Sequence, residues 1–359
     1  MKNVVAFVLA LMAASAWAAQ EPAAPDIPAF VKRLDSLRES HRIQGLSAVV
    51  VRDQAIVLAV GLGYADVEGR IPATAETAYD IASVAKPLSA VVALRLVDEG
   101  KLDIDRPMSA YSQWPDFCAG FSQQPTIFAK DLRCEPPVHT LRHLLSHTAT
   151  GTPGEHFSYN PVLFSWASRP VMAVAGAPFS DLVKRYVFEP AGMTRSARKH
   201  RDLPLREVVA KQLAPAYHVN AAGAVGRSPA SPPQGDGAAG GVVTTAIDLA
   251  KFDIALDQGT LISAKSRKAM MTPMRSSDGK QLPYGVGWFV QEYQGHTLAW
   301  HSGWWENAYS ALYVKVPDRN LSFIVLANGE GVWRGNPQDK ADVETSEFAK
   351  AFLQAFVGR

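Results

Sequence analysis

Apolar residues recur along the chain at two different spacings, and these divide it into helical and strand-like segments. Residues 26–42 carry apolar side chains three and four positions apart, which places them on one face of a helix. Residues 46–51 and 55–60 are short β-rich runs separated by Asp53-Gln54, a pattern typical of a hairpin. The same reasoning predicts further helices over 87–99, 141–146, 162–175, 179–188, 244–258, 263–271 and 343–356, and further strands over 284–293, 297–303, 308–316 and 322–327.

Strands are therefore predicted near both chain ends and helices in the middle. This order predicts an α+β fold in which one antiparallel sheet, built from both chain ends, is flanked by helices. A mainly helical lobe over about 87–245 is inserted between the two parts of the sheet. Residues 203–241 are rich in Gly, Pro and Ala and are expected to form a long surface loop near a site. We expect one folded domain over 26–359.

The first residues follow a different pattern, with a charge at Lys2, an apolar run over 4–14 and the small-x-small sequence Ala16-Trp17-Ala18. These are the three regions of a secretory signal peptide, which we assign to residues 1–18. The run is shorter than the roughly 20 apolar residues of a transmembrane helix, and a retained anchor or a buried first helix is the alternative. We therefore expect an exported protein, periplasmic or secreted, without a membrane span after signal cleavage.

Composition narrows the class of protein further. The chain has 359 residues, of which 47% are hydrophobic and 19% charged, and its net charge is +2, as in an ordinary globular protein. It has no dense run of Lys and Arg, so no nucleic-acid partner is expected. Its two cysteines are Cys118 and Cys134. In an oxidising compartment they are expected to form a disulfide, the alternative being two free thiols.

Candidate chemistry begins at the entrance of the predicted helix over 87–99, where Ser83 and Lys86 stand three residues apart. At a helix entrance this spacing puts both side chains on one face, so the amine can reach the hydroxyl. A buried lysine has a lowered pKa and can act as a base near neutral pH, which would activate the serine as a nucleophile. Taken alone, such a pair is more often a serine helix cap followed by a solvated lysine.

Flanking segments reverse that interpretation. The segments 79–86, 100–107, 140–148, 189–193 and 239–245 follow one another as in a known superfamily. Through them the chain resembles the serine β-lactamases and penicillin-binding proteins, in particular the branch of class C-like β-lactamases, D-aminopeptidases and esterases. The resemblance covers roughly residues 30–330. It implies a β-lactamase/transpeptidase-like fold and a serine hydrolase that works through an acyl-enzyme.

The resemblance places a second motif around Tyr159, which falls on the tyrosine of the family's Tyr-x-Asn, while Pro161 stands where the asparagine is usual. A phenol beside a lysine can pass protons between nucleophile and leaving group, whereas an isolated tyrosine is more often half-buried packing. Asn160 is adjacent but is expected to point elsewhere. Proline has neither a side-chain donor nor a backbone N–H, so Pro161 argues against β-lactam turnover more than against acyl transfer.

A third motif, the His-x-Gly of this branch, matches residues 301–303. The resemblance implies that His301 shapes the electrostatics of the cleft and that Gly303 lets a substrate lie against its strand. It also implies that the backbone N–H groups of Ser83 and Trp304 hold the oxyanion. The two successive tryptophans that begin at Trp304 are expected either to wall an apolar pocket or to be buried in the core.

Two segments of the chain differ in length from those of the family, and a metal-binding motif is absent. The segment between 148 and 159 is short compared with the family, which would leave one wall of the cleft open. Residues 117–136 resemble an insertion, stapled near its ends by the two cysteines. His143 and His147 are four residues apart, but no Glu completes a His-Glu-x-x-His motif, so neither a metal nor another cofactor is expected.

The sequence thus predicts a serine hydrolase in which Ser83 attacks an ester or amide carbonyl while Lys86 and Tyr159 move the proton. The expected substrate is a small molecule or a peptide, with cell-wall-derived compounds included. An esterase, a β-lactamase and a D-amino-acid peptidase all stay open. The alternative from another class is a catalytically weak binding or sensor protein, which Pro161 favours and the retained catalytic side chains oppose.

Overall fold

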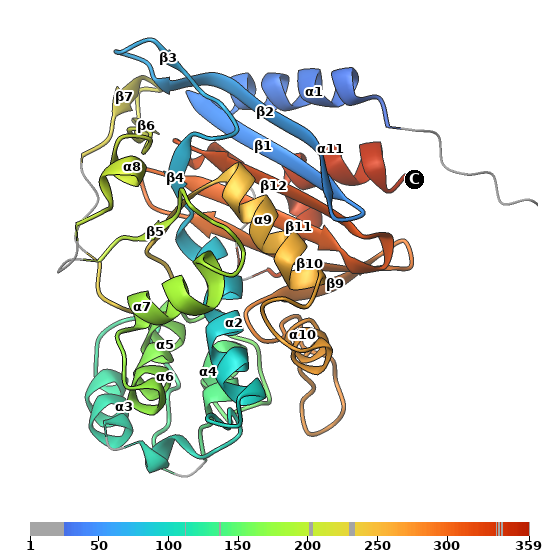
Figure 1. The fold of residues 1–359 in the computed structure, drawn as a ribbon. Helices are drawn as coiled ribbons and strands as arrows, with labels where there is room; N and C mark the ends of the chain where they lie inside the picture. Colours follow the sequence, from blue (N-terminus) through green and yellow to red (C-terminus); the bar gives the residue numbers. More distant parts are fainter. Residues whose placement is uncertain are drawn as a thin grey trace, which may run out of the picture.

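The computed structural model describes residues 25–358 except 112, 136–137, 201–203, 230–233, 335, 337 and 339, so the predicted signal peptide lies outside the described residues. A seven-stranded antiparallel sheet organises the fold (Figure 1), in the order β3-β2-β1-β12-β11-β10-β9. Its strands are β1 (Gly45–Arg52), β2 (Ala55–Asp66), β3 (Ile71–Pro72), β9 (Phe289–Tyr293), β10 (His296–Trp304), β11 (Ser310–Val316) and β12 (Leu321–Ala327). Because β1 pairs antiparallel with β12, the sheet joins both chain ends as predicted.

One face of the sheet is covered by the first and last helices, α1 (Ile27–Ser40) and α11 (Glu347–Phe356). Asp26 begins α1 by accepting a hydrogen bond from the Ala29 N–H at 3.0 Å. Phe30, Phe323, Phe352 and Phe356 are among the buried aromatic side chains between these helices and the sheet. Both chain ends therefore contribute to one shared core.

The opposite face packs against α2 (Ala85–Asp98) and α9 (Ala246–Asp257). All residues of α2 from Ala85 to Leu94 are buried, as expected for a helix in the centre of a large core. An ion pair attaches α9 to the sheet, because Nζ of Lys315 on β11 lies 2.8 Å from the Asp253 carboxylate and both side chains are buried. Ser83 stands at the entrance of α2, so this packing fixes the candidate site against the sheet.

The other elements are short, and many of the helices lie in the lobe below the sheet in Figure 1. The helices are α3 (Trp114–Ser122), α4 (Leu141–Leu145), α5 (Pro161–Trp166), α6 (Ser168–Ala175), α7 (Phe179–Val183), a π-helical turn (Lys184–Phe188), α8 (Glu207–Ala210) and α10 (Ala264–Met270). The strands are β4 (Ala78–Asp80), β5 (Ala197–Arg198), β6 (Tyr217–Val219), β7 (Val225–Arg227) and β8 (Val242–Thr245). Turns of 3₁₀-helix cover Ala82–Val84, Met108–Ala110, Pro317–Arg319, Glu330–Val332 and Val343–Thr345. The predicted α+β class with an antiparallel sheet flanked by helices is thereby confirmed.

Some predicted boundaries are wrong for local reasons. The strand predicted from residue 284 begins only at Phe289, because Gly287 has φ +83° and a Cβ on Gly285 would lie 2.4 Å from the Met270 carbonyl oxygen. The last helix begins at Glu347, where the Ser346 side chain caps it. The segment 203–241, predicted to be irregular, contains α8 and the β6–β7 hairpin.

Cys118 and Cys134 form the predicted disulfide, with their sulfur atoms 2.07 Å apart. It links α3 to Cys134, in the segment before α4. In the part of the chain that the structure describes, no helix combines the length and the apolar character needed to cross a membrane.

Candidate active site

Ser83 lies in the 3₁₀ turn that connects β4 to α2. The preceding residue, Ala82, has φ +46°, a left-handed conformation that is unfavourable for a residue with a Cβ. The buried carboxylate of Asp80 supports this turn by accepting the Ala82 N–H at 2.9 Å. Strained backbone beside a half-buried serine hydroxyl is typical of an active-site turn.

Lys86, in the first turn of α2, is fully buried, and its Nζ lies 2.7 Å from Oγ of Ser83. The carbonyl oxygen of Ala239, in the loop before β8, is 3.2 Å from the same nitrogen. The rings of Tyr159 and Phe164 enclose the amine, with centroids 5.0 and 5.3 Å away. Burial holds the pKa of Lys86 well below its ordinary value of 10.5, which favours the free amine, a base. Lys86 is therefore not the solvated lysine of the capping alternative.

The hydroxyl of Tyr159 is buried and lies close to the side chains of Ser83 and Gln338. Among the described residues, none has hydrogen-bonding geometry to this hydroxyl. Burial raises the pKa of Tyr159 above its ordinary value, so the phenol keeps its proton near neutral pH. The structure thus brings together the three side chains that the sequence placed in one site, Ser83, Lys86 and Tyr159.

His147 holds the backbone on both sides of Tyr159. The N–H of Ser158 donates to the His147 carbonyl oxygen at 2.8 Å, and the N–H of Asn160 donates to its Nδ1 at 3.0 Å. The two rings are adjacent, with centroids 4.3 Å apart. Because Nδ1 accepts, the proton of the neutral imidazole is on Nε2. Burial, together with nearby Lys86, holds the pKa of His147 well below 6.5.

His301, on β10, is also fully buried, and both ring nitrogens have partners. Its Nδ1–H donates to the Ser302 carbonyl oxygen at 2.6 Å, and its Nε2 accepts the Tyr284 hydroxyl at 2.9 Å. Burial and then the charge of Lys86 hold the pKa of His301 well below 6.5. His301 is therefore a neutral group, 6.1 Å from the Tyr159 ring between centroids.

Gly303 lies directly against the segment that carries Ser83. A Cβ at this position would be 2.2 Å from the Ile81 carbonyl oxygen, so only glycine lets β10 approach the turn this closely. The next residue, Trp304, is 37% exposed. Its indole stacks on Trp333 at 4.5 Å and donates from Nε1 to Glu330 at 2.7 Å. Trp304 is thus a fixed aromatic surface at the end of β10 rather than a core residue.

Asn160 points away from Ser83, as the sequence predicted. Its Oδ1 caps α5 by accepting the Leu163 N–H at 3.0 Å, and its Nδ2 donates to the Phe128 carbonyl oxygen at 2.7 Å. Pro161 occupies the first position of α5, where its missing N–H costs nothing. In the place of an amide side chain, the Phe164 ring of the same helix covers Lys86.

Sequence reasoning missed four contributors to this arrangement: the Ala239 carbonyl, the His147 clamp, the Tyr284 hydroxyl and the Gln338 side chain. The sequence pattern of His147, four residues after His143, indicates only a metal-ligand spacing and not this role. No group of three or more metal-binding side chains occurs among the residues that the structure describes. Cavities of about 470 and 690 Å³ lie in the helical lobe, but neither is lined by Ser83 or Lys86.

An antiparallel sheet joined from both chain ends, with a serine and a lysine at the entrance of a buried helix, defines the class of serine β-lactamases and penicillin-binding proteins. The chain belongs to this family, since the family model described as Beta-lactamase matches residues 30–346.

Curated relatives agree with this assignment. A protein of Bacillus subtilis (strain 168) described as a penicillin-binding protein, PbpX, is 29% identical over 259 residues, which is 68% of this chain and 61% of that protein. The human serine beta-lactamase-like protein LACTB, mitochondrial, is 41% identical over 138 residues, 36% of this chain and 23% of LACTB. The chain thus spans less than two thirds of the length of either relative.

Solved structures share the fold. The octameric penicillin-binding protein homologue from Pyrococcus abyssi has a TM-score of 0.73 at 23% identity, covering 91% of this chain and 77% of that one. The D-amino acid amidase from Ochrobactrum anthropi SV3 has a TM-score of 0.65 at 19% identity, covering 92% and 99%. EstCE1, described as a hydrolase with promiscuous acyltransferase activity, has a TM-score of 0.67 at 19% identity, covering 90% and 98%.

Proposed function

We propose that the protein is a serine hydrolase that cleaves an ester or amide through an acyl-enzyme on Ser83. The observation that carries the proposal is the buried pair of Lys86 Nζ and Ser83 Oγ, 2.7 Å apart. An uncharged amine at this distance can take the serine proton as Oγ attacks the carbonyl carbon. Membership in the β-lactamase family supports a hydrolase of this type.

In the proposed mechanism, the C–O or C–N bond of the substrate breaks as the leaving group accepts a proton. The protonated phenol of Tyr159, beside both Lys86 and Ser83, is the donor, and the Lys86 ammonium restores its proton. The N–H groups of Ser83 and Trp304 would stabilise the oxyanion, with Gly303 keeping β10 close to the turn. Water then attacks the acyl-enzyme by the reverse proton path and releases the acid.

We favour esters as substrates over β-lactams. Pro161 supplies no side-chain amide, and His301 supplies a neutral ring instead of a fixed positive charge. An ester has no amide N–H to satisfy and a better leaving group than an amide, so it depends least on these missing groups. The fold neighbours described as a D-amino acid amidase and as a hydrolase with promiscuous acyltransferase activity are consistent with acyl-transfer chemistry on this fold.

The test is the intact mass of the protein after treatment with a serine-reactive phosphonate. We expect a single adduct in the wild type and none in Ser83→Ala. The same pair is then assayed with a chromogenic ester, a cephalosporin and a D-Ala-D-Ala peptide. Turnover of the ester that is lost in Ser83→Ala supports the proposal, whereas an adduct that persists in Ser83→Ala contradicts it.

A binding or sensor protein is the second candidate, because Pro161 alters a motif that the family uses in turnover. In that case all three substrates stay uncleaved by the wild type, while one of them still binds in equilibrium dialysis.

The proposed location is outside the cytoplasm, periplasmic or secreted, where the Cys118–Cys134 disulfide is stable and cell-wall-derived substrates are available.

A further inference from the structure

The disulfide-stapled insertion is hydrogen-bonded to the segment that carries Tyr159. The Phe128 carbonyl oxygen accepts Nδ2 of Asn160 at 2.7 Å, and the Asp131 carbonyl oxygen accepts the Gly151 N–H at 2.8 Å. The described residues of the insertion therefore bind the Tyr159 segment through two main-chain oxygens.

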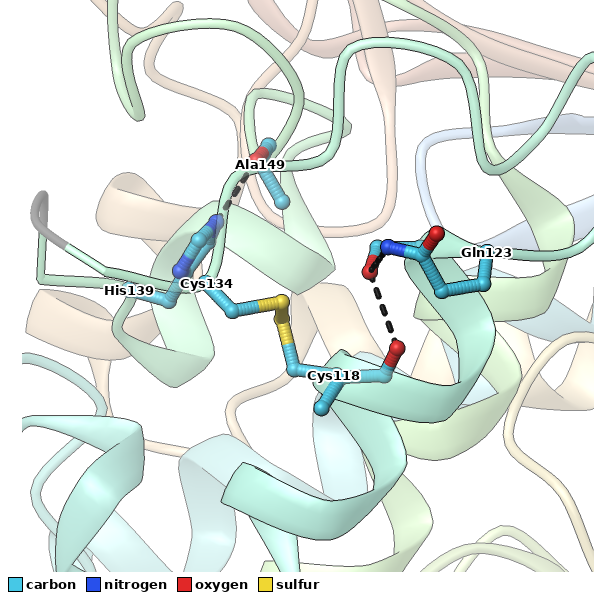
Figure 2. Close-up of a disulfide and its surroundings, with 7 residues drawn as sticks. Cys118, Gln123, Cys134, His139 and Ala149 are labelled. Atoms are coloured by element: carbon cyan, nitrogen blue, oxygen red, sulfur yellow. Dashed lines mark hydrogen bonds between the residues drawn. A yellow bond between two sulfur atoms is a disulfide. The ribbon is translucent and has the colours of Figure 1, made fainter.

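The insertion is anchored on both sides. The Cys118–Cys134 bridge ties α3 to the segment leading to His139, whose Nε2–H donates to the Ala149 carbonyl oxygen at 2.8 Å (Figure 2). On the other side, Trp114 of α3 packs against Trp166 at the end of α5, with ring centroids 5.1 Å apart. A segment held at both ends in this way has few alternative positions.

Asn160 connects the insertion to the candidate site. It is 3% exposed, and four of its groups are hydrogen-bonded: its N–H to His147, its carbonyl oxygen and Oδ1 to the α5 backbone and its Nδ2 to Phe128. It is also the residue next to Tyr159, whose own side chain lacks a hydrogen bond among the described residues. The position of the Tyr159 hydroxyl therefore depends on the packing of its ring and on the backbone that Asn160 and His147 hold.

We propose that Asn160, held by the stapled insertion, is a positioning residue for Tyr159. This inference rests on the proposed function only for the role of Tyr159 in proton transfer. The insertion then serves the reaction by fixing the distance of the phenol from Ser83 and Lys86. His147, His301 and Tyr284 are titratable groups near the Tyr159 ring, and the Asn160 N–H donates to the first of them.

The central variant is Asn160→Ser, which keeps an oxygen able to cap α5 and loses the donor to Phe128. We expect kcat for the ester about 5- to 10-fold lower, as for one buried hydrogen bond, with KM within about twofold of wild type. Removing the bridge in Cys118→Ala/Cys134→Ala should lower kcat in the same way. In the triple variant the effects should not add, because both changes break one connection.

The matched control is Ser263→Ala, which removes the cap of α10 at a comparable cost in stability, about 1 kcal/mol, outside this connection. Its kcat should stay at the wild-type value. Asn160→Ser with wild-type kcat, or additive effects in the triple variant, would overturn the inference.

A second measurement separates this inference from the proposed function. Hydrogen exchange of the Ser158 and Asn160 amides, both bonded to His147, needs no substrate. We expect faster exchange at these amides in Asn160→Ser and in the bridge variant, and unchanged exchange in Ser263→Ala. If the wild type turns over nothing but exchange changes as expected, the function fails and the positioning stands. Unchanged exchange in both variants contradicts the positioning whatever the activity.

Discussion

Lys86 and His301 are buried nitrogen bases near the Tyr159 ring, and burial lowers the pKa of both. Their surroundings give them different roles. Lys86 has the Ser83 hydroxyl within reach, whereas both nitrogens of His301 are already bonded to Tyr284 and Ser302. In the proposed mechanism Lys86 is therefore the base that takes the Ser83 proton, because both ring nitrogens of His301 are already bonded.

Lys86 should lower the free energy of unfolding, because its amine is buried, although it supports activity. We expect Lys86→Met to reduce ester turnover by about 1,000-fold or more and to stabilise the fold by about 0.5 to 2 kcal/mol at neutral pH. The folded-state pKa of Lys86 lies below the unfolded value of 10.5, so between the two the unfolded chain binds more protons. Burial of the Lys86 amine therefore costs the wild type no stability above pH 10.5. Below that pH, the free energy of unfolding decreases as the pH falls toward the folded-state pKa.

Urea unfolding of both proteins between pH 6 and 10 checks this expectation. The advantage of Lys86→Met should be greatest at low pH and shrink as the pH rises. An advantage that stays constant over the range, or that grows with pH, would show that the Lys86 amine is charged in the folded protein.

Single residues of the site were predictable to different degrees. Ser83 and Lys86 follow from local helix geometry, and Tyr159 and His301 from motifs that resemble a known family. Tyr284 and Gln338 contact the site from distant parts of the chain, and no periodicity in the sequence encodes such a contact. The left-handed φ of Ala82 was equally invisible in the sequence, because alanine does not favour this conformation.

At the scale of elements, the contact between β10 and the turn before α2 determines the shape of the site. Gly303 is the point of closest approach, with room for hydrogen but not for a methyl group. Helix and strand periodicities predicted both elements well, because each buries a regular pattern of apolar residues. Their mutual approach was not predictable, since it depends on a backbone oxygen of Ile81 opposite one glycine.

Gly303→Ala should therefore displace β10 from the Ser83 turn. We expect at least a 100-fold loss of phosphonate labelling at Ser83, because a 1 Å displacement of reacting groups has effects of about this size. The control is Gly295→Ala, in the turn between β9 and β10, where φ is +83° and a Cβ meets no atom within 4 Å. That variant should lose about 1 kcal/mol of stability and keep its labelling rate. Equal labelling of both variants would refute a tight contact at Gly303.

At the scale of the whole molecule, α9 is fixed to the sheet by a buried polar cluster. The Asp253 carboxylate accepts from Nζ of Lys315 and from the hydroxyls of Tyr313 and Ser322. Burial alone would lower the pKa of Lys315, but the carboxylates of Asp253 and Asp257 raise it above its ordinary value. The α+β architecture was predictable from element order, but this cluster joins residues about 60 apart in sequence and lay outside any local pattern.

Asp253→Ala should destabilise the fold by about 3 to 5 kcal/mol, because it leaves a buried cation with one partner fewer. Chemical denaturation at pH 7 measures this loss. The pKa of Lys315 is higher in the folded chain than in the unfolded chain. Its contribution to the free energy of unfolding is therefore complete below pH 10.5 and is lost as the pH rises through the folded-state pKa. A loss below about 1 kcal/mol would contradict a structural role for the cluster.

The bond between Gln338 and Ser302 has a consequence for the size of substrates. Because β9 pairs with β10 only as far as Trp300, no strand among the described residues lies beside the stretch from His301 to Trp304 on that side. An extended peptide that aligned there would compete with Gln338, whose Nε2 already donates to the Ser302 carbonyl oxygen at 2.7 Å. Under the proposed function, a short acyl group would not need to displace that amide to reach Ser83. The Gln338 side chain at this strand edge should then favour compact esters over long peptides.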